Sequence, residues 1–293
     1  MSALAVLLDS LVDYAGLFPP AKLPMAEAVR NYAAYRAGPH RAILGRFIVP
    51  LARLPEFEAA VRQLEPGIPQ AWELSVLGGA DGAADRLLIE AFNARHPTAR
   101  IVAVETKATT LAELRRATGG LPSSLEVWIE IPTASPGLPS LLQAIKEAGH
   151  FAKIRTGGVT PESIPSSLDV AHFLMACRRA DLVFKATAGL HHPLRGLYPL
   201  TYQADAPSGR LFGFLNVFLA AALIAAEGSA QEIGDLLDDS DGRNFFVHPE
   251  AMAWRGHRFT VEQLARMRRN SCRSFGSCSF TEPIEGLQDL HWL

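Results

Sequence analysis

The chain has 293 residues, of which 48% are hydrophobic and 20% charged, and its formal net charge is −2. This balance leaves no basic footprint for nucleic acid or for an anionic membrane surface, so neither is an expected partner. The composition favours a folded protein that acts on a small-molecule substrate. The length is enough for one large domain or two ordinary ones, with ample apolar material for a core.

Three features of the chain bear on its location and assembly. Its cysteines, Cys177, Cys272 and Cys278, are too few for a disulfide framework. The opening MSALAVLLDSLVDYAG lacks the basic stretch of a secretory signal, so we predict a cytoplasmic protein. The longest apolar stretch, 211–226, contains Asn216 and is shorter than the roughly 20 residues of a membrane span. It predicts a buried helix, either in the core or at the interface of a homo-oligomer.

Taken in chain order, residues 1–45 predict a helical segment packed on a following domain at 46–293. From residue 46 onward, short β-rich runs alternate with helical patterns. The predicted strands are 46–51, 71–79, 100–108, 125–132, 150–158 and 181–189, and the predicted helices between them are 54–64, 81–95, 110–118, 138–148 and 164–179. This alternation predicts repeated βαβ crossovers and a parallel sheet.

Two further strand patterns, at 244–249 and 273–280, would bring the number of strands to eight. The predicted fold class is therefore α/β, a TIM-like (β/α)8 barrel with an N-terminal helical extension. A doubly wound open sheet is the main alternative. It is less favoured because no G-x-G-x-x-G follows the first strand and no P-loop is present.

Charged residues recur on one face of five consecutive predicted strands, while the opposite face of each is apolar. In a barrel the apolar face meets the helices, so the charged faces converge on the interior, and the active site lies at the C-terminal ends. An antiparallel sheet with one solvated face would show the same alternation. The residues expected to converge are Glu73, Glu105, Lys107, Glu130, Lys153, Arg155 and Lys185.

Lys185 stands within the apolar run LVFKATAGLHHP, residues 182–193. Burying an ammonium group without a partner costs several kcal/mol or forces it to lose its proton. We expect Lys153 and Arg155, together with burial, to lower the pKa of Lys185. A neutral amine is the nucleophile of Schiff-base catalysis, and Glu130 would move protons. The catalytic candidates are Lys185, Lys153, Glu130 and Glu105.

The segment VFKATAG resembles the lysine strand of deoxyribose-phosphate aldolase, a class I aldolase of the barrel fold, in which the motif runs Lys-Thr-Ser-Thr-Gly. The resemblance covers this segment alone and implies a Schiff base on Lys185. It would make the protein a carbon–carbon lyase for a small anionic carbonyl compound. This chain differs in carrying its second lysine, Lys153, on the preceding strand, and in having Glu130 where that family has an aspartate.

Loop residues after the charged strands complete the predicted site. The glycines there either let backbone N–H groups approach an anionic group of the substrate or serve only as turns. His191 and His192 are candidate proton donors or substrate contacts. The substrate-binding candidates are Glu73, Lys107, Arg155, Gly157, Gly158, Thr187, Gly189, His191 and His192.

Two other functions remain open from the sequence. A metal-dependent lyase or hydrolase would use His191, His192 or His248 with glutamates. No metal or other cofactor is expected, because four basic side chains would oppose a divalent cation. The other possibility is a non-catalytic barrel with a structural network of ion pairs in its interior.

Residues near the two ends of the chain leave further questions. Cys278 is flanked by glycine and serine near the predicted last strand, so it could face the site as a nucleophile. We favour a buried structural thiol, because no histidine lies close to it in the sequence. Asp13 and Tyr14 precede a double proline, which suits either a rigid lid or the closed bottom of a barrel. The sequence does not decide between these two positions.

Overall fold

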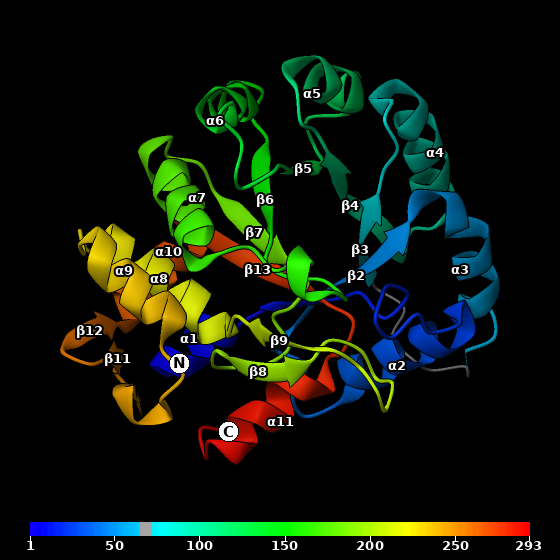
Figure 1. Cartoon of the computed structure of the whole chain (residues 1–293). Coiled ribbons are helices and arrows are strands. Elements are labelled where there is room, and N and C mark those ends of the chain that lie inside the picture. Colours follow the sequence, from blue (N-terminus) through cyan, green and yellow to red (C-terminus); the bar gives the residue numbers. More distant parts are fainter. Residues whose placement is uncertain (65–71) are drawn as a thin grey trace.

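The computed structural model describes residues 1–64 and 72–293, and a closed barrel of parallel strands forms its centre (Figure 1). Around the barrel the strands follow the order β1-β13-β7-β6-β5-β4-β3-β2. Their bounds are β1 (Val12–Tyr14), β2 (Leu44–Pro50), β3 (Trp72–Leu77), β4 (Ala99–Lys107), β5 (Glu126–Glu130), β6 (Phe151–Arg155), β7 (Phe184–Thr187) and β13 (Cys272–Ser277). The predicted TIM-like α/β barrel is confirmed.

Helices cover the outside of the barrel, and most of them connect one barrel strand to the next (Figure 1). The connecting helices include α2 (Met25–Ala37), α3 (Leu54–Val61), α4 (Gly82–Arg95), α5 (Leu111–Thr118), α6 (Leu138–Glu147), α7 (Ser167–Arg179), α8 (Phe214–Ala225), α9 (Ala230–Asp238) and α10 (Val261–Asn270). At the two ends of the chain lie α1 (Ala3–Leu8) and α11 (Thr281–Asp289). The five helices predicted between residues 54 and 179 are confirmed.

Polar caps fix where several of these helices begin. The Asp81 side chain accepts hydrogen bonds from the backbone N–H groups of Ala83 and Ala84 at the start of α4. Ser166 and Asp169 form a reciprocal capping box at the start of α7. Such caps satisfy backbone N–H groups that have no partner inside the helix. The first of these helices begins one residue after the predicted start at 81, and the second begins three residues after the predicted start at 164.

Two barrel strands differ from the prediction. The first is β1, which lies within residues 1–45 and pairs in parallel with β13 and β2, so this segment supplies a barrel strand as well as helices. The second difference is that residues 244–249 do not enter the barrel. There β10 (Phe245–His248) forms an antiparallel sheet with β11 (Ala251–Trp254) and β12 (His257–Thr260). The last barrel strand is β13, as the pattern at 273–280 predicted. The predicted strand 71–79 begins at a residue outside the described part of the chain.

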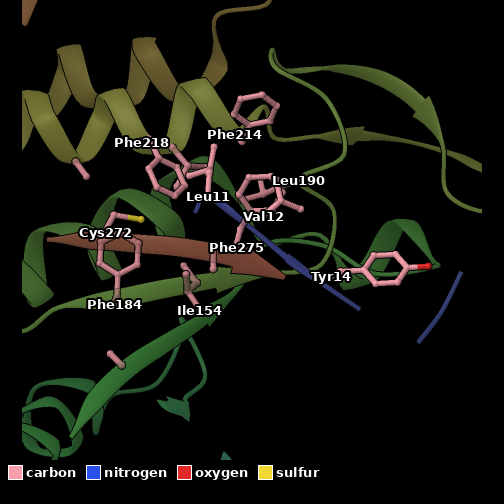
Figure 2. Packing of buried hydrophobic residues seen from close by; sticks show 14 of the residues in the cluster. Leu11, Val12, Tyr14, Ile154, Phe184, Leu190, Phe214, Phe218, Cys272 and Phe275 are labelled. Carbon is pink, nitrogen blue, oxygen red and sulfur yellow. The ribbon is translucent and has the colours of Figure 1, made fainter. Parts of the chain in front are cut away.

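The core lies between the barrel and its helices. Figure 2 shows Phe214 and Phe218 of α8 against Phe275 of β13, and the ring centroids lie 5.5 and 6.3 Å from that of Phe275. Residues Phe214–Leu223 of α8 are all buried by the chain itself. The prediction of a buried helix is confirmed for the core, and α8 offers no broad exposed face to a second copy. Within residues 1–64 and 72–293, no helix has the length and apolar character that crossing a membrane requires.

Candidate active site

The register of four neighbouring strands aligns charged residues inside the barrel. Lys107 of β4 pairs with Glu130 of β5, Glu130 with Lys153 of β6, and Lys153 with Lys185 of β7. Residues paired across parallel strands point to the same face of the sheet. On β5, Val127 and Ile129 belong to the apolar core, so Glu130 points to the opposite face.

These residues form a continuous chain of buried ion pairs. Lys185 Nζ lies 2.5 Å from Asp13 Oδ2 and 2.8 Å from Glu105 Oε1. Lys153 Nζ lies 2.9 Å from Glu105 Oε2 and 3.0 Å from Glu130 Oε2. The ion pairs therefore run Asp13–Lys185–Glu105–Lys153–Glu130 across the interior. Each of these side chains is 10% exposed or less.

Serine hydroxyls satisfy further carboxylate oxygens in this chain. Ser75 of β3 donates a hydrogen bond to Glu105, and Ser274 of β13 donates one to Asp13, each at 2.8 Å. Asp13 also accepts the backbone N–H of Arg46. Asp13 and Tyr14 therefore lie neither in a lid nor at the bottom of the barrel. Both belong to the barrel strand β1.

The predicted lowering of the Lys185 pKa is wrong. Burial by itself lowers the pKa of this ammonium, but the carboxylates of Asp13 and Glu105 outweigh burial and raise it. Glu105 lies between Lys185 and Lys153, so attraction replaces the expected repulsion between the two lysines. For the Glu130 carboxyl, burial by itself raises the pKa, but the positive charges of Lys153 and Arg155 outweigh burial and lower the pKa to about 2. Lys185 and Glu130 are therefore both charged near neutral pH.

Two more cations form ion pairs with Glu130 at the C-terminal end of the barrel. Arg155 Nε lies 3.1 Å and Lys107 Nζ 3.4 Å from Glu130 Oε1. Their side chains are 45% and 66% exposed. Three carboxylates thus face four cations, Lys107, Lys153, Arg155 and Lys185, and one positive charge is left over.

Glu73 is the one predicted site residue that lies elsewhere along the barrel. It is the second residue of β3, so it lies at the N-terminal end of the barrel, although it points to the same face as Ser75. Its side chain is 66% exposed and lies 3.6 Å from Arg46. The prediction that Glu73 joins the other charges is therefore wrong, because side-chain alternation specifies a face and not a height along the barrel.

A cavity of about 720 Å³ opens at the C-terminal ends of the strands. This volume is in the range of small-molecule sites. Lys185 does not line it, because its side chain is only 1% exposed and its ammonium is enclosed by Asp13 and Glu105. The predicted site residues that do line it are Glu105, Lys107, Glu130, Lys153, Arg155, Gly157, Gly158, Thr187, Gly189, His191 and His192.

Gly157 and Gly189 have a structural explanation. A Cβ atom on Gly157 would lie 2.9 Å from the Cα of Gly189, and one on Gly189 would lie 3.0 Å from the Cα of Gly157. Gly189 also has a φ of +79°, a backbone conformation that residues other than glycine rarely adopt. These glycines allow the loops after β6 and β7 to touch, so the turn alternative accounts for them.

The cavity wall contains a cluster that the sequence prediction did not assemble. Cys278 follows β13, and its Sγ lies 4.0 Å from His191 Nε2. His191 Nδ1 lies 2.5 Å from Glu282 Oε2, and the Tyr202 hydroxyl lies 3.7 Å from the same Sγ. All four residues line the cavity. Cys278 is buried, as predicted, but the fold brings a histidine to it from 87 positions away, so the alternative of a nucleophile facing the site stays open.

His191 and His192 have opposite electrostatic environments. Burial lowers the pKa of His191, but its contacts with Cys278 and Glu282 outweigh burial and raise the pKa to about 10. Burial and the neighbouring His191 lower the pKa of His192 to about 4. Near neutral pH, His191 is consequently an imidazolium and His192 a neutral imidazole, which stacks on Tyr198.

A hairpin completes the wall beside Cys278. It consists of β8 (Gly196–Pro199) and β9 (Ser208–Leu211), which pair in antiparallel fashion, and the connection between them carries Tyr202. The C-terminal helix α11 supplies Glu282 from its first turn. Only Cys278 and His191 drew attention in the sequence; Glu282 and Tyr202 carry no local motif that would identify them.

The metal-dependent alternative would need a set of ligands for the ion. Among the described residues, no three His, Cys, Asp or Glu side chains are grouped so as to hold a metal ion. His248 lies exposed on β10, outside the cavity.

No family model, curated protein or solved structure matches the chain. The fold and the cavity thus define a TIM-like barrel with a charged, small-molecule-sized site at its C-terminal mouth. The resemblance around Lys185 has no family match to support it.

Proposed function

We propose that the protein is an enzyme in which Cys278 attacks a small carboxylic acid derivative in the barrel mouth and transfers or hydrolyses its acyl group. The observation that carries this proposal is the contact sequence Cys278–His191–Glu282 in the cavity wall. A nucleophile, a base within reach of it and a third group that orients the base are the parts of nucleophilic acyl transfer.

The roles follow from the contacts. Cys278 Sγ forms a bond to the acyl carbon of the substrate, and its proton resides on His191 Nε2. The bond between the acyl carbon and the leaving group then breaks, and His191 gives that proton to the departing atom. In hydrolysis a water molecule next loses a proton to the now neutral His191 and attacks the thioester, which frees the acid and regenerates the Cys278 thiolate beside the His191 imidazolium. Glu282 is a positioning residue, because it holds His191 at Nδ1.

The other two cysteines support a special role for Cys278. All three cysteines are buried, and burial raises the pKa of the Cys177 and Cys272 thiols. Neither lines the cavity. Cys278 instead has an imidazole and a phenol as neighbours and faces the cavity. Buried apolar thiols are unreactive, whereas a thiol beside a charged histidine is the reactive kind.

A Schiff-base lyase is the second candidate, and one observation favours it. Lys153 lines the cavity, so an amine is within reach of a bound carbonyl compound. Glu105 and Glu130 lie beside its ammonium, where their negative charges would stabilise the iminium cation that forms when the carbonyl oxygen leaves as water. This candidate moves the predicted nucleophile from Lys185 to Lys153.

The test is a search for the acyl-enzyme. The protein is mixed with p-nitrophenyl acetate, and nitrophenolate release is followed while the protein is analysed by mass spectrometry. We expect a burst of about one equivalent and an acetyl group on the peptide that contains Cys278. Cys278→Ser should abolish the burst and the adduct, and Cys272→Ser should retain both. Acetylation that is no greater at Cys278 than at surface lysines would refute the proposal.

A further inference from the structure

We infer that the substrate carries a negatively charged group, and that Arg155 and Lys107 bind this group while Cys278 attacks the other end. This inference rests on the proposed role of Cys278. It adds a specificity site to the nucleophile and defines the substrate class as a small acyl compound with a carboxylate or a similar anion at its far end.

The ion-paired cluster in the interior of the barrel is not electrically neutral. Asp13, Glu105 and Glu130 face the four cations Lys107, Lys153, Arg155 and Lys185, so one positive charge is not balanced. Lys153 and Lys185 are enclosed among carboxylates. The uncompensated charge therefore resides on the two exposed members, Arg155 and Lys107, which share the single oxygen Glu130 Oε1.

The geometry of Arg155 is the second argument. Among the described residues, Arg155 pairs with Glu130 through Nε, which leaves Nη1 and Nη2 for a ligand. These two nitrogens form the fork that binds a carboxylate with two parallel hydrogen bonds. Arg155 is 45% exposed and lines the cavity, so this fork is accessible to a bound molecule.

The separation of the two ends is the third argument. Arg155 pairs with Thr187, and Thr187 pairs with Gly276 on the next strand. Two strand spacings of about 4.8 Å place the Cα atoms of Arg155 and Gly276 roughly 10 Å apart. Cys278 follows Gly276 by two residues. A small molecule can therefore contact the fork of Arg155 and the Cys278 sulfur at the same time.

Two alkylating probes that differ in charge test this inference. Iodoacetate and iodoacetamide both form an S–C bond with a thiol and release iodide, but only iodoacetate carries a carboxylate. The rates at Cys278 are measured by mass spectrometry in the native protein and in urea-unfolded protein, which gives the intrinsic ratio of the two rates. We expect the ratio of iodoacetate to iodoacetamide to be at least tenfold higher in the native protein, with saturation by iodoacetate.

Variants identify the residues responsible. Arg155→Met should bring the ratio close to that of the unfolded chain, Arg155→Lys should restore part of it, and Lys107→Met should lower it less. Arg115→Met is the matched control, because Arg115 is exposed on α5 and does not line the cavity. Its ratio should equal that of the wild type. Circular dichroism on each variant identifies any that fails to fold.

The outcomes separate the two proposals. If Cys278 reacts readily but the native ratio equals the unfolded one, or Arg155→Met and Arg155→Lys leave it unchanged, the anion site is refuted and the nucleophile stands. If native Cys278 reacts with iodoacetamide no faster than Cys272, the proposed nucleophile is refuted and the anion-binding inference falls with it.

Discussion

His191 Nε2 lies 4.0 Å from Cys278 Sγ, although 87 positions separate the two residues in the sequence. The contact exists because β7 and β13 are neighbours in the barrel, where the orange-red strand β13 lies beside the green β7 (Figure 1). His191 follows the first of these strands and Cys278 the second. Their loops therefore meet at the C-terminal mouth, which is where barrel enzymes carry their chemistry.

The ion pairs around Glu105 are expected to stabilise the fold. Glu105→Gln removes one carboxylate from between two buried ammonium groups, and breaking a buried pair in this way costs about 3–5 kcal/mol. We expect a loss of this size in the free energy of unfolding, measured by urea denaturation. Glu73→Gln is the matched control at the exposed end of the barrel and should cost about 0.5 kcal/mol or less. A Glu105→Gln variant as stable as the control would contradict the importance of these pairs.

The charge on His191 predicts a pH dependence of stability. Its pKa is raised from an unfolded value of about 6.5 to about 10 in the folded protein. A group whose pKa is raised by folding stabilises the folded protein fully at pH values below its pKa in the unfolded chain. This stabilisation is lost as the pH rises through its pKa in the folded protein. The stability difference between wild type and His191→Gln should therefore be largest below about pH 6.5 and should shrink up to about pH 10. Melting temperatures at several pH values measure it.

The exposed His172 on α7 provides the control for that experiment. His172→Gln should leave the melting temperature unchanged relative to wild type at every pH. A difference for His191→Gln that grows with pH, or that is constant from pH 6 to pH 10, would show that His191 is not held as an imidazolium by Glu282 and Cys278.

Lys185 is expected to be structural, and borohydride trapping tests this expectation. The protein is incubated near pH 7 with pyruvate or glyceraldehyde and then reduced. No adduct is expected on the peptide that contains Lys185, because its ammonium is charged, enclosed and paired with Asp13 and Glu105. Lys185→Met should destabilise the protein by about 3–5 kcal/mol, since two carboxylates lose their common partner.

The site of any adduct decides between the candidate functions. An adduct on Lys153 would support the Schiff-base lyase, because Lys153 faces the cavity. An adduct on Lys185, with little loss of stability in Lys185→Met, would restore the mechanism predicted from the sequence and contradict the structural role assigned here.

The barrel and most of its interior charges could be predicted from the sequence. The six runs between residues 46 and 189 each alternate with a helix, and the side-chain alternation identified Glu105, Glu130, Lys153 and Lys185 as facing inward. This information is local and periodic, so a pattern can carry it. The strand β1 has only three residues, which is too short to show alternation, and Asp13 was missed with it.

The missing Asp13 explains why the Lys185 pKa was predicted with the wrong sign. The sequence indicated two basic neighbours for Lys185, Lys153 and Arg155, but not the carboxylate that β1 supplies from two strands away in the barrel. The cluster at Cys278 was missed for a related reason. His191, Tyr202, Cys278 and Glu282 come from four separate loops and helix ends, and only the closed barrel brings them together.

The pH dependence of Cys278 alkylation tests whether His191 activates the Cys278 thiol. Iodoacetamide modification of Cys278 is measured from pH 6 to pH 9 in wild type and in His191→Gln, with Cys272 as the internal reference. We expect Cys278 to react far faster than Cys272 in the wild type. We also expect His191→Gln to slow Cys278 by about 10²-fold at pH 7, because the thiolate loses the imidazolium that stabilises it, and this loss of rate should narrow toward pH 9, where thiols ionise without such help. Equal reactivity of Cys278 and Cys272, or an unchanged Cys278 rate in His191→Gln, would contradict this activation.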